Sequence, residues 1–321
     1  MEPLTTSHKT RVETQLQHDT HWFVDGNVLL QIGQVRFRLH RSRLVAQSAW
    51  FKSLFERQVG ILQGNEFEDQ EEIDQALGSA QVVDGLDLFY LDYPDGPTAT
   101  EFAELLMATD KAIEYLDDPP PFPVLQNVFV AAVFFRFRSF KRAMENSIEA
   151  LFPDSVGEVT SAAIPHAVDA FNLGRTYAAV KGVVPRALYE LARTPANFHN
   201  CSDEESTRKH PLRNLSADDL LLLMDIQKEF TTFWDTAIAI FATKSDCPDP
   251  NCSTLLMLQK AIQMRKSYPL DPIVGLQYLI VHLLSSEALC RTEVDRISPK
   301  LVAGRNDLWS RLRVWSWVVE E

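Results

Sequence analysis

Apolar and polar residues alternate in two short stretches near the start of the chain, residues 28–32 and 35–39. An alternation with a period of two is typical of a strand that has one more deeply buried face. Only Gly33 and Gln34 separate the two stretches, so we expect a tight β-hairpin. The positions predicted to face the core are Val28, Leu30, Ile32, Val35, Phe37 and Leu39.

The spacing of apolar residues changes from two to about 3.6 just past His40, which indicates a helix. The stripe that this spacing defines consists of Leu44, Ser48, Phe51, Leu54 and Phe55. We therefore predict a hairpin followed by two short helices that end near Gln58. Such a unit is a compact nucleus for an α+β domain.

Residues 60–80 change the character of the chain because they contain little apolar material. Six acidic residues gather there: Glu66, Glu68, Asp69, Glu71, Glu72 and Asp74. We expect an acidic insertion that is exposed to solvent and partly flexible, and an acidic docking segment is the alternative. After it, residues 82–92 resume an apolar pattern, which predicts a third strand interrupted at Asp84-Gly85.

Helical patterns follow as far as residue 155. Thr98 and Glu101 have the spacing of a capping box, which predicts the start of a helix. Residues 124–137 are apolar on nearly every side and predict a buried helix. A further amphipathic helix ends before Pro153. These elements complete a predicted domain over residues 21–155.

The remaining residues, 156–321, carry apolar positions at helical spacing and predict an all-α region. Gly182 is a predicted helix stop, and Pro185 suits the first turn of the next helix. Ser216 and Asp219 form a second capping box, which starts a long helix through Phe241. The last predicted helices cover residues 255–264, 274–289 and 308–319.

The charge balance narrows the classes of partner. The chain has 321 residues, enough for two domains, with 31 Lys and Arg against 44 Asp and Glu. A formal net charge of -13 argues against nucleic acid as the partner, because binding a phosphate backbone requires a basic surface. A local basic cluster, Arg36, Arg38, Arg41 and Arg43, is interpreted as the solvated faces of a strand and a helix.

The N-terminal residues and the cysteines bear on the compartment. Residues 1–20 are polar without periodicity, so we expect a flexible tail. Residues 1–17 lack the apolar core of a secretory signal, and no run reaches the roughly 20 apolar residues of a membrane span. We expect no membrane partner. The four cysteines are expected to be reduced thiols in an intracellular protein, cytoplasmic or nuclear.

Cys247 and Cys252 are the only residues with ligand-like spacing, since they lie close together in a proline-containing loop. Further ligands would have to come from His282, Cys290 or Cys201, because structural zinc takes four ligands. We favour ordinary thiols and expect no metal. A metal-dependent protein or enzyme with its site around Cys247, Cys252 and Cys290 is the alternative.

Motifs of catalysis and of nucleotide binding are missing from the sequence. Glycine is scarce, with 12 residues, and none are arranged as a phosphate-binding loop. His40 has only Ser42 and Ser48 near it, and nothing resembles a nucleophile elbow. We therefore predict a protein that is not an enzyme and needs no cofactor.

The residues from Asp25 to Glu56 resemble the BTB/POZ domain, in particular the form common in fungal proteins. The resemblance extends less closely to about Asp154, and residues beyond it resemble the helical extension that many such proteins carry. The residues that carry it are Asp25, Val28, Phe37, His40, Arg41, Leu44, Ser48, Phe51 and Phe55.

The resemblance implies a fold, residue roles and an interaction function. It implies that residues 82–92 pair into the sheet and that Asp25, His40, Ser48 and Phe55 are structural. It implies dimerisation with a second copy or another BTB chain, and in some dimers the segment corresponding to residues 18–23 is exchanged between subunits. A cullin-3-type ubiquitin ligase scaffold is a further implied partner, which would make the chain an adaptor. Transcriptional regulation is an alternative. The expected interface residues are Leu44, Val45, Trp50, Phe51 and Leu54.

Overall fold

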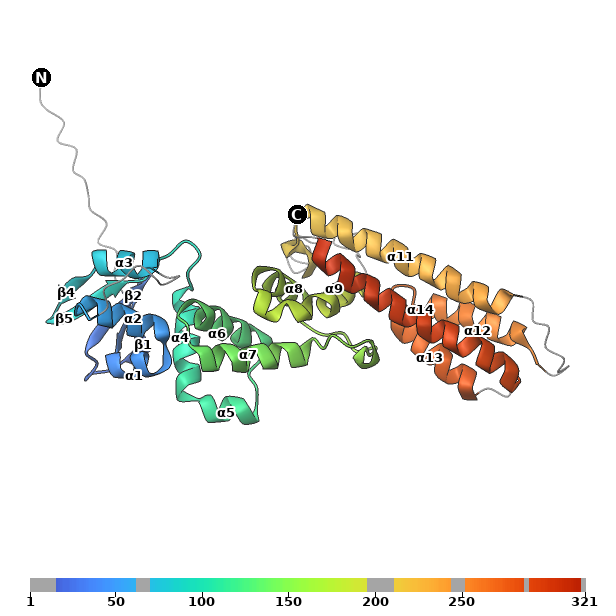
Figure 1. Ribbon diagram of the computed structural model, residues 1–321, viewed down its shortest axis with the longest axis horizontal. Coiled ribbons are helices and arrows are strands. Elements are labelled where there is room, and N and C mark those ends of the chain that lie inside the picture. Colours follow the sequence, from blue (N-terminus) through green and yellow to red (C-terminus); the bar gives the residue numbers. More distant parts are fainter. Residues whose placement is uncertain (1–15, 62–69, 195–210, 244–251, 286–288, 319–321) are drawn as a thin grey trace, which may run out of the picture. The chain divides into compact units, whose positions relative to one another are not determined.

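The computed structural model describes residues 16–61, 70–194, 211–243, 252–285 and 289–318. These residues form two compact units, Met1–Ser147 and Ile148–Glu321. The first contains a small mixed sheet with helices, and the second is helical (Figure 1). The predicted α+β class and the predominance of helix in the C-terminal region are confirmed. The boundary between the units falls inside a helix, a few residues before the expected one at 155.

Five strands form the sheet: β1 (Leu16–Trp22), β2 (Val28–Ile32), β3 (Val35–Leu39), β4 (Gln81–Val83) and β5 (Leu86–Tyr90). Their order is β1-β3-β2-β5-β4. β2 and β3 form the predicted antiparallel hairpin, with Leu30 opposite Phe37. β5 lies parallel to β2, with Phe89 beside Leu30, and β4 pairs antiparallel with β5. β1 runs parallel to β3, so β1 and β4 are the two edges.

Two tight turns set this topology. Gly33, in the first hairpin, has a φ of 56°, which favours glycine because a side chain is strained there. Asp84 and Gly85 have φ values of 51° and 78°, as in the type I′ turns that join hairpin strands. The stretch expected to be one interrupted strand is therefore a hairpin of two strands.

The N-terminal tail expected over residues 1–20 needs a correction at its end. Residues 1–15 lie outside the described residues. Residues 16–20, however, belong to β1, which begins at Leu16. The sequence of β1 has no alternating pattern. The strand forms because it pairs with β3 and because His21 contacts Ala103 in the helix over residues 99–110.

Seven helices are described in the first unit and across its boundary: α1 (Arg41–Gln47), α2 (Ala49–Gln58), α3 (Gln70–Gly78), α4 (Ala99–Asp110), α5 (Ala112–Asp117), α6 (Phe122–Phe134) and α7 (Arg138–Leu151). Thr98 and Glu101 make the predicted capping box at the start of α4. The two predicted helices after His40 are α1 and α2, separated by an extended Ser48.

The expectation of an exposed acidic insertion over residues 60–80 needs a correction in the part that the structure describes. Residues 62–69 lie outside the described part, and residues 70–78 form α3. Ile73 and Ala76 on α3 are buried, and Arg57 of α2 contacts the Asp74 carboxylate at 2.7 Å. Because these two apolar residues are three apart, α3 has a face that packs on the unit.

The core of the first unit is aromatic. The Phe51 ring lies 5.1 Å from the ring of Phe135 and 6.1 Å from that of Phe102. Trp50 packs edge-on against Phe135, with ring centroids 5.2 Å apart. Phe37 of β3 meets Phe102 edge-on at 5.2 Å, so this cluster joins the sheet to α2, α4 and the end of α6.

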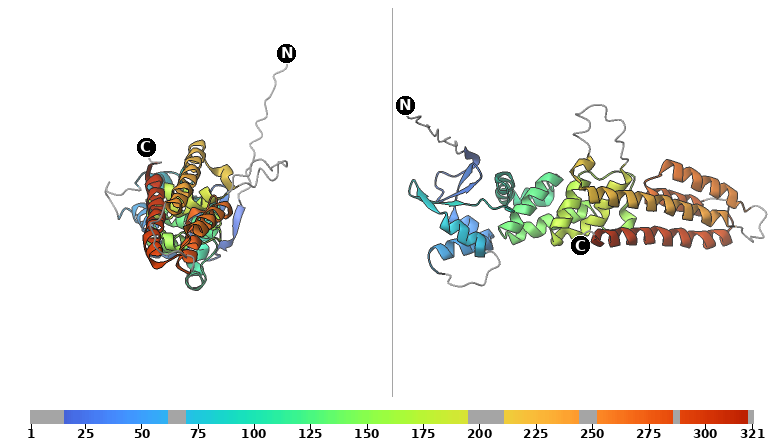
Figure 2. Two further views of the ribbon diagram at one scale, coloured as in Figure 1. Left: turned by 90° about the vertical axis from the view of Figure 1, so that its right-hand side faces the viewer. Right: turned by 90° about the horizontal axis from the view of Figure 1, so that it is seen from above.

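The second unit is built from helices: η1 (Val156–Glu158), α8 (Ala167–Thr176), η2 (Ala178–Val183), α9 (Val184–Arg193), η4 (Pro211–Asn214), α11 (Ala217–Ala242), α12 (Thr254–Ser267), α13 (Pro272–Ser285) and α14 (Arg291–Val318). The predicted capping box of Ser216 and Asp219 opens α11. The four long helices α11 to α14 run beside one another (Figures 1 and 2).

Large apolar side chains fill the space between these four helices. Trp234 and Phe241 of α11 pack in one cluster with Leu276 and Leu279 of α13. Gly275 allows this approach, because a Cβ there would lie 2.7 Å from the Trp234 ring. The glycine therefore serves close helix packing.

The last helix is longer than predicted. α14 begins at Arg291, whereas the sequence predicted a start at 308, and it continues through Pro299. A proline inside a helix removes one backbone hydrogen bond. Buried residues on both sides, Ile297 and Leu301, hold the helix against α11 and α13. Among the described residues, no helix is long and apolar enough to cross a membrane.

Truncation of Trp50 tests the aromatic core. We expect Trp50→Ala to lower the free energy of unfolding by about 3–5 kcal/mol, because Trp50 is almost fully buried. Val45→Ala, on a half-buried residue of the preceding helix, is the control and should change it by about 1 kcal/mol or less. Chemical denaturation followed by circular dichroism measures both, and equal effects would contradict the assignment of Trp50 to the core.

Candidate interaction surfaces

Four of the five residues expected at a partner interface lie inside the first unit. Leu44, Trp50, Phe51 and Leu54 are each 3% exposed or less, and Val45 is half-buried. These four residues therefore belong to the core of the unit and do not form an exposed apolar patch. Trp50 and Phe51 pack within the aromatic core of the same unit.

The residues expected to be structural form contacts around α1 and α2. His40 Nε2 lies 3.3 Å from Asp25 Oδ1, just before α1. Ser48 Oγ accepts the Phe51 N–H at 3.0 Å and donates to the Phe135 carbonyl at 2.5 Å. Ser48 therefore caps α2 and ties it to the end of α6. The Arg41 guanidinium lies 4.7 Å from the centre of the Phe55 ring, which is buried beneath it.

The edge strand β1 is joined to β3 mainly at its two ends. Leu16 N–H donates to the Gln34 carbonyl and Phe23 N–H to the Arg38 carbonyl, both at 2.9 Å. Between Gln17 and Trp22 the register shifts, as in a β-bulge. The middle of β1 therefore depends on side-chain contacts.

Two histidines supply those contacts. His18 Nδ1 accepts the N–H groups of Thr20 and His21 at 3.2 Å each, and its ring stacks on Phe37. The buried His21 ring lies 4.9 Å from that of His18, and its Nε2 donates to the Ala103 carbonyl of α4 at 3.2 Å. Burial lowers the pKa of both imidazoles. The neutral rings thus hold β1 to the unit.

An apolar groove lies between α5 and α7. It has a volume of about 360 Å³ and is lined by residues that include Ala112, Tyr115, Phe140 and Met144. Burial raises the pKa of the Tyr115 hydroxyl. Ile113, on the same short helix α5, is 78% exposed. The volume and the apolar lining of this groove are typical of sites where proteins bind ligands.

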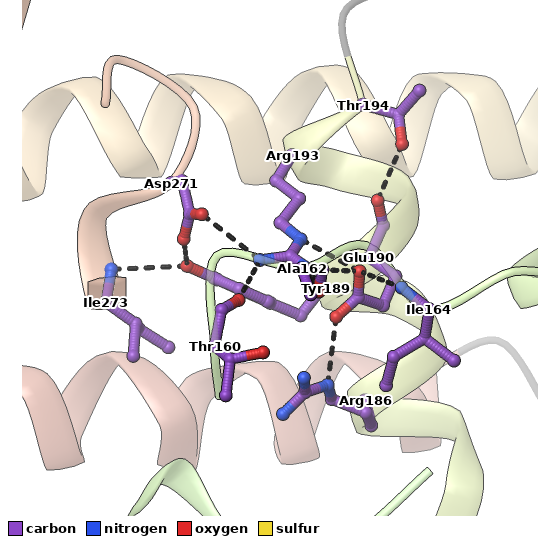
Figure 3. A network of polar contacts seen from close by, with 10 residues as sticks. All are labelled: Thr160, Ala162, Ile164, Arg186, Tyr189, Glu190, Arg193, Thr194, Asp271 and Ile273. Atoms are coloured by element: carbon purple, nitrogen blue, oxygen red, sulfur yellow. Dashed lines mark hydrogen bonds and ion pairs between the residues drawn. The ribbon is translucent and has the colours of Figure 1, made fainter. Parts of the chain in front are cut away.

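A buried network of charged side chains lies in the second unit (Figure 3). Glu190 of α9 is at its centre: Oε1 accepts from Arg186 Nε at 3.0 Å, and Oε2 accepts from Arg193 Nε at 2.8 Å. Arg193 also lies 3.1 Å from Asp271, in the turn between α12 and α13. The Tyr189 hydroxyl donates to Asp271 at 2.5 Å and accepts the Ile273 N–H at 3.2 Å.

Burial dominates the electrostatics of this network. It raises the pKa of the Tyr189 hydroxyl well above its usual value, and the nearby Asp271 carboxylate adds to the effect. Burial also lowers the pKa of Arg186, against the attraction of Glu190. Arg193 bonds in addition to the carbonyls of Thr160 and Ala162, at 2.5 and 2.6 Å. The network therefore fastens α9 to two other segments.

The cysteine candidates do not converge on a site in the described residues. Cys247 and Cys201 lie outside them. Cys252 and Cys290 are half-buried and are not joined in a disulfide, and Cys290 N–H approaches Cys252 Sγ at 3.5 Å. Within the described ranges, no three His, Cys, Asp or Glu side chains are grouped as metal ligands would be.

Several of these features were missed from the sequence. His18 and His21 fall in a stretch interpreted as tail. The signal for the buried network was present in part, because Arg186, Glu190 and Arg193 follow helical spacing on a helix whose neighbours are apolar. Asp271 is far away in the sequence and gave no signal.

Comparison with protein-family models, with curated proteins and with solved structures finds no match to this chain.

Removing the charge of Glu190 tests the buried network. We expect Glu190→Gln to lower the free energy of unfolding by about 3 kcal/mol, because it leaves two buried arginines without their carboxylate. Glu229→Gln, which breaks an exposed pair with Arg311, should lower it by about 1 kcal/mol or less. Urea denaturation compares them, and similar losses would show that the buried network stabilises the fold no more than an exposed ion pair does.

The histidines predict a pH dependence of the first unit. Because the folded pKa values of His18 and His21 lie below the usual 6.5, the neutral rings contribute stability above that pH. This contribution is lost as the pH falls below 6.5. Three charged groups also act on these rings. Asp19 raises the pKa of His18, Asp110 raises that of His21 and Arg43 lowers that of His21, but burial has the largest effect on both pKa values.

Hydrogen exchange of β1 and β3 peptides, read by mass spectrometry, measures this loss. Protection should fall with acidification after correction for the intrinsic exchange rate. A His18→Gln/His21→Gln variant should show a flatter pH profile. His282→Gln, on an exposed residue of α13, is the control and should keep the wild-type profile. An unchanged profile in the double variant would contradict the assignment.

Proposed function

We propose that this chain is a non-enzymatic protein–protein interaction module. Its N-terminal unit pairs with a second copy or with another chain of the same fold. The order of elements supports this proposal: a hairpin leads into two short helices, and a later strand returns parallel to the first strand of the hairpin. This is an arrangement consistent with the resemblance to BTB/POZ domains.

The observation that carries the proposal is the exposed edge strand β1. Edge strands offer unpaired backbone groups to other chains, and proteins commonly protect them by shortness, charged residues, proline or a β-bulge. β4, the other edge, is three residues long, whereas β1 has seven residues and contains neither lysine nor proline. The bulge of β1 and its one charged residue, Asp19, lie in the middle of the strand, so its start at Leu16 is not covered by either. Leu16 at its start is 59% exposed, and Val24 just past its end is 85% exposed. Such a strand suits pairing with a strand of a second chain.

The resemblance adds a second class of partner. A dimeric BTB chain acting as an adaptor would bind a cullin-3-type ubiquitin ligase scaffold through a surface separate from its dimer interface. The apolar groove between α5 and α7, together with the exposed Ile113 on α5, supports such a second contact. In this proposal β1 serves self-association and the groove serves the scaffold.

Self-association is tested by size-exclusion chromatography with light scattering. We expect a dimer at about 50 µM that dissociates on dilution. Val24→Lys should weaken the dimer by about tenfold or more, because it places a charge in an apolar contact. A chain that stays monomeric throughout would overturn self-association through β1.

Val82→Lys provides the matched control. Val82 lies on the short edge β4 and is 71% exposed, so the substitution adds the same charge to the same unit at a similar exposure. We expect it to leave the dimer unchanged. Equal weakening by the two substitutions would place the contact elsewhere and contradict the role of β1.

A further inference from the structure

A basic hollow lies in the first unit where the end of α1, the start of α2 and the start of α7 meet. Its volume is about 460 Å³. Its walls include the apolar side chains of Val45, Ala49 and Phe140, and three cationic side chains, Lys52, Arg136 and Arg138. We refer to it as the basic hollow.

Backbone contacts fix the walls of the basic hollow. Ala49 N–H, at the start of α2, donates to the Arg136 carbonyl at 3.4 Å. Ser48 Oγ donates to the neighbouring carbonyl of Phe135 at 2.5 Å. Arg136 itself adopts a left-handed conformation with a φ of 53°, which turns the chain between α6 and α7. The hollow is therefore held in shape by the fold.

The charge of the hollow is opposite to that of the chain. Acidic residues outnumber basic ones by 44 to 31 overall. In the hollow, Lys52 lies 3.9 Å from Glu56, a weak exposed pair. Arg138, which lines the hollow, is exposed. Arg142 is not part of the lining, but it is also exposed and follows Arg138 by one helical turn on the same face of α7. Neither side chain has an ion pair or hydrogen bond to any described residue.

Backbone groups add to this positive charge. Arg138, Ser139 and Phe140 are the first three residues of α7, which has 14 residues. Their N–H groups have no acceptor within the helix, and the helix dipole places partial positive charge at this end. Together with the side chains of Arg138 and Arg142, these groups favour carboxylates.

We propose that the basic hollow binds a carboxylate-rich segment of a partner protein, with an apolar side chain of that segment against Val45, Ala49 and Phe140. The mixed polar and apolar lining suits a peptide. A nucleic acid fits poorly, because its long phosphate backbone would meet the negative charge of the rest of the chain. The site goes beyond the proposed self-association and does not depend on it.

Fluorescence anisotropy with the full chain tests the proposal. The probe is a labelled peptide of four Glu-Glu-Leu repeats, compared with four Gln-Gln-Leu repeats. We expect the acidic peptide to bind more tightly, by about tenfold or more, and its affinity to fall as NaCl rises from about 0.05 M to 0.5 M. Equal affinity for the two peptides would overturn the proposal.

A pair of charge-reversal variants locates the site. Arg138→Glu/Arg142→Glu should weaken binding of the acidic peptide by about tenfold or more. Lys266→Glu/Arg291→Glu makes the same change in net charge at exposed positions of the second unit and should leave binding within about twofold of the wild-type value. Equal losses in both variants would show general electrostatic attraction and overturn the site.

Two further readouts distinguish a specific peptide site from loss of folding and from nucleic-acid binding. Circular dichroism should show the same helix content for both charge-reversal variants, and lost binding with intact folding supports the site. A labelled oligonucleotide of matched length should bind more weakly than the acidic peptide, and tighter binding of the oligonucleotide would overturn the assignment to a protein partner. If the chain is monomeric and still binds the peptide, the proposed self-association is wrong and the peptide site stands.

Discussion

Burial of the apolar face of α2 is the constraint on which the first unit depends. Trp50, Phe51, Leu54 and Phe55 all point from this one helix into the unit. They meet the sheet, α4 and the end of α6, elements that come from distant parts of the sequence. Ser48 fixes the orientation of α2. Its hydroxyl caps the start of the helix by accepting the Phe51 N–H, and it donates a hydrogen bond to the Phe135 carbonyl. The sheet contributes Leu30, Phe37 and Phe89, all fully buried, to the same core.

The second unit combines two kinds of interaction. Its long helices are joined by apolar packing around Trp234 and Phe241, which is tolerant of small shifts. The network around Glu190 is directional, because each oxygen and nitrogen has an assigned partner from α9 or the turn before α13. Buried polar networks of this kind rigidify and define one arrangement of the segments they join. Apolar packing therefore joins the long helices to one another, and the polar network joins α9 to the turn before α13.

Local patterns predicted much of the fold. The hairpin of β2 and β3 follows from alternation around Gly33, and the starts of α4 and α11 follow from capping boxes at Thr98 and Ser216. β1 could not be predicted, because Leu16-Gln-His-Asp-Thr-His-Trp has no alternation and forms a strand through β3 and α4. The turn at Asp84 was recognised as a break, but pairing across it depends on the rest of the sheet.

The candidate site was harder to predict than the fold. An apolar stripe on a helix shows that one face is buried, but the same stripe fits packing within the chain or against a partner. Leu44, Trp50, Phe51 and Leu54 were assigned to a partner interface, but all four are buried within the unit, where Trp50 and Phe51 pack against Phe135 just past α6. The basic hollow has no continuous signal, since Lys52 and Arg138 are brought together only by the contact between α2 and the turn after α6.

The conformation of Arg136 has a consequence for how this chain can change. A left-handed backbone at a residue with a side chain costs about 1 kcal/mol, and glycine would relieve that strain. Glycine at this position would, however, take away one of the cations that line the basic hollow. A single residue there is subject to two opposed demands, the ease of turning the chain and the positive charge beside α7. Selection for thermal stability alone would favour glycine at position 136, which relieves the backbone strain and removes the positive charge.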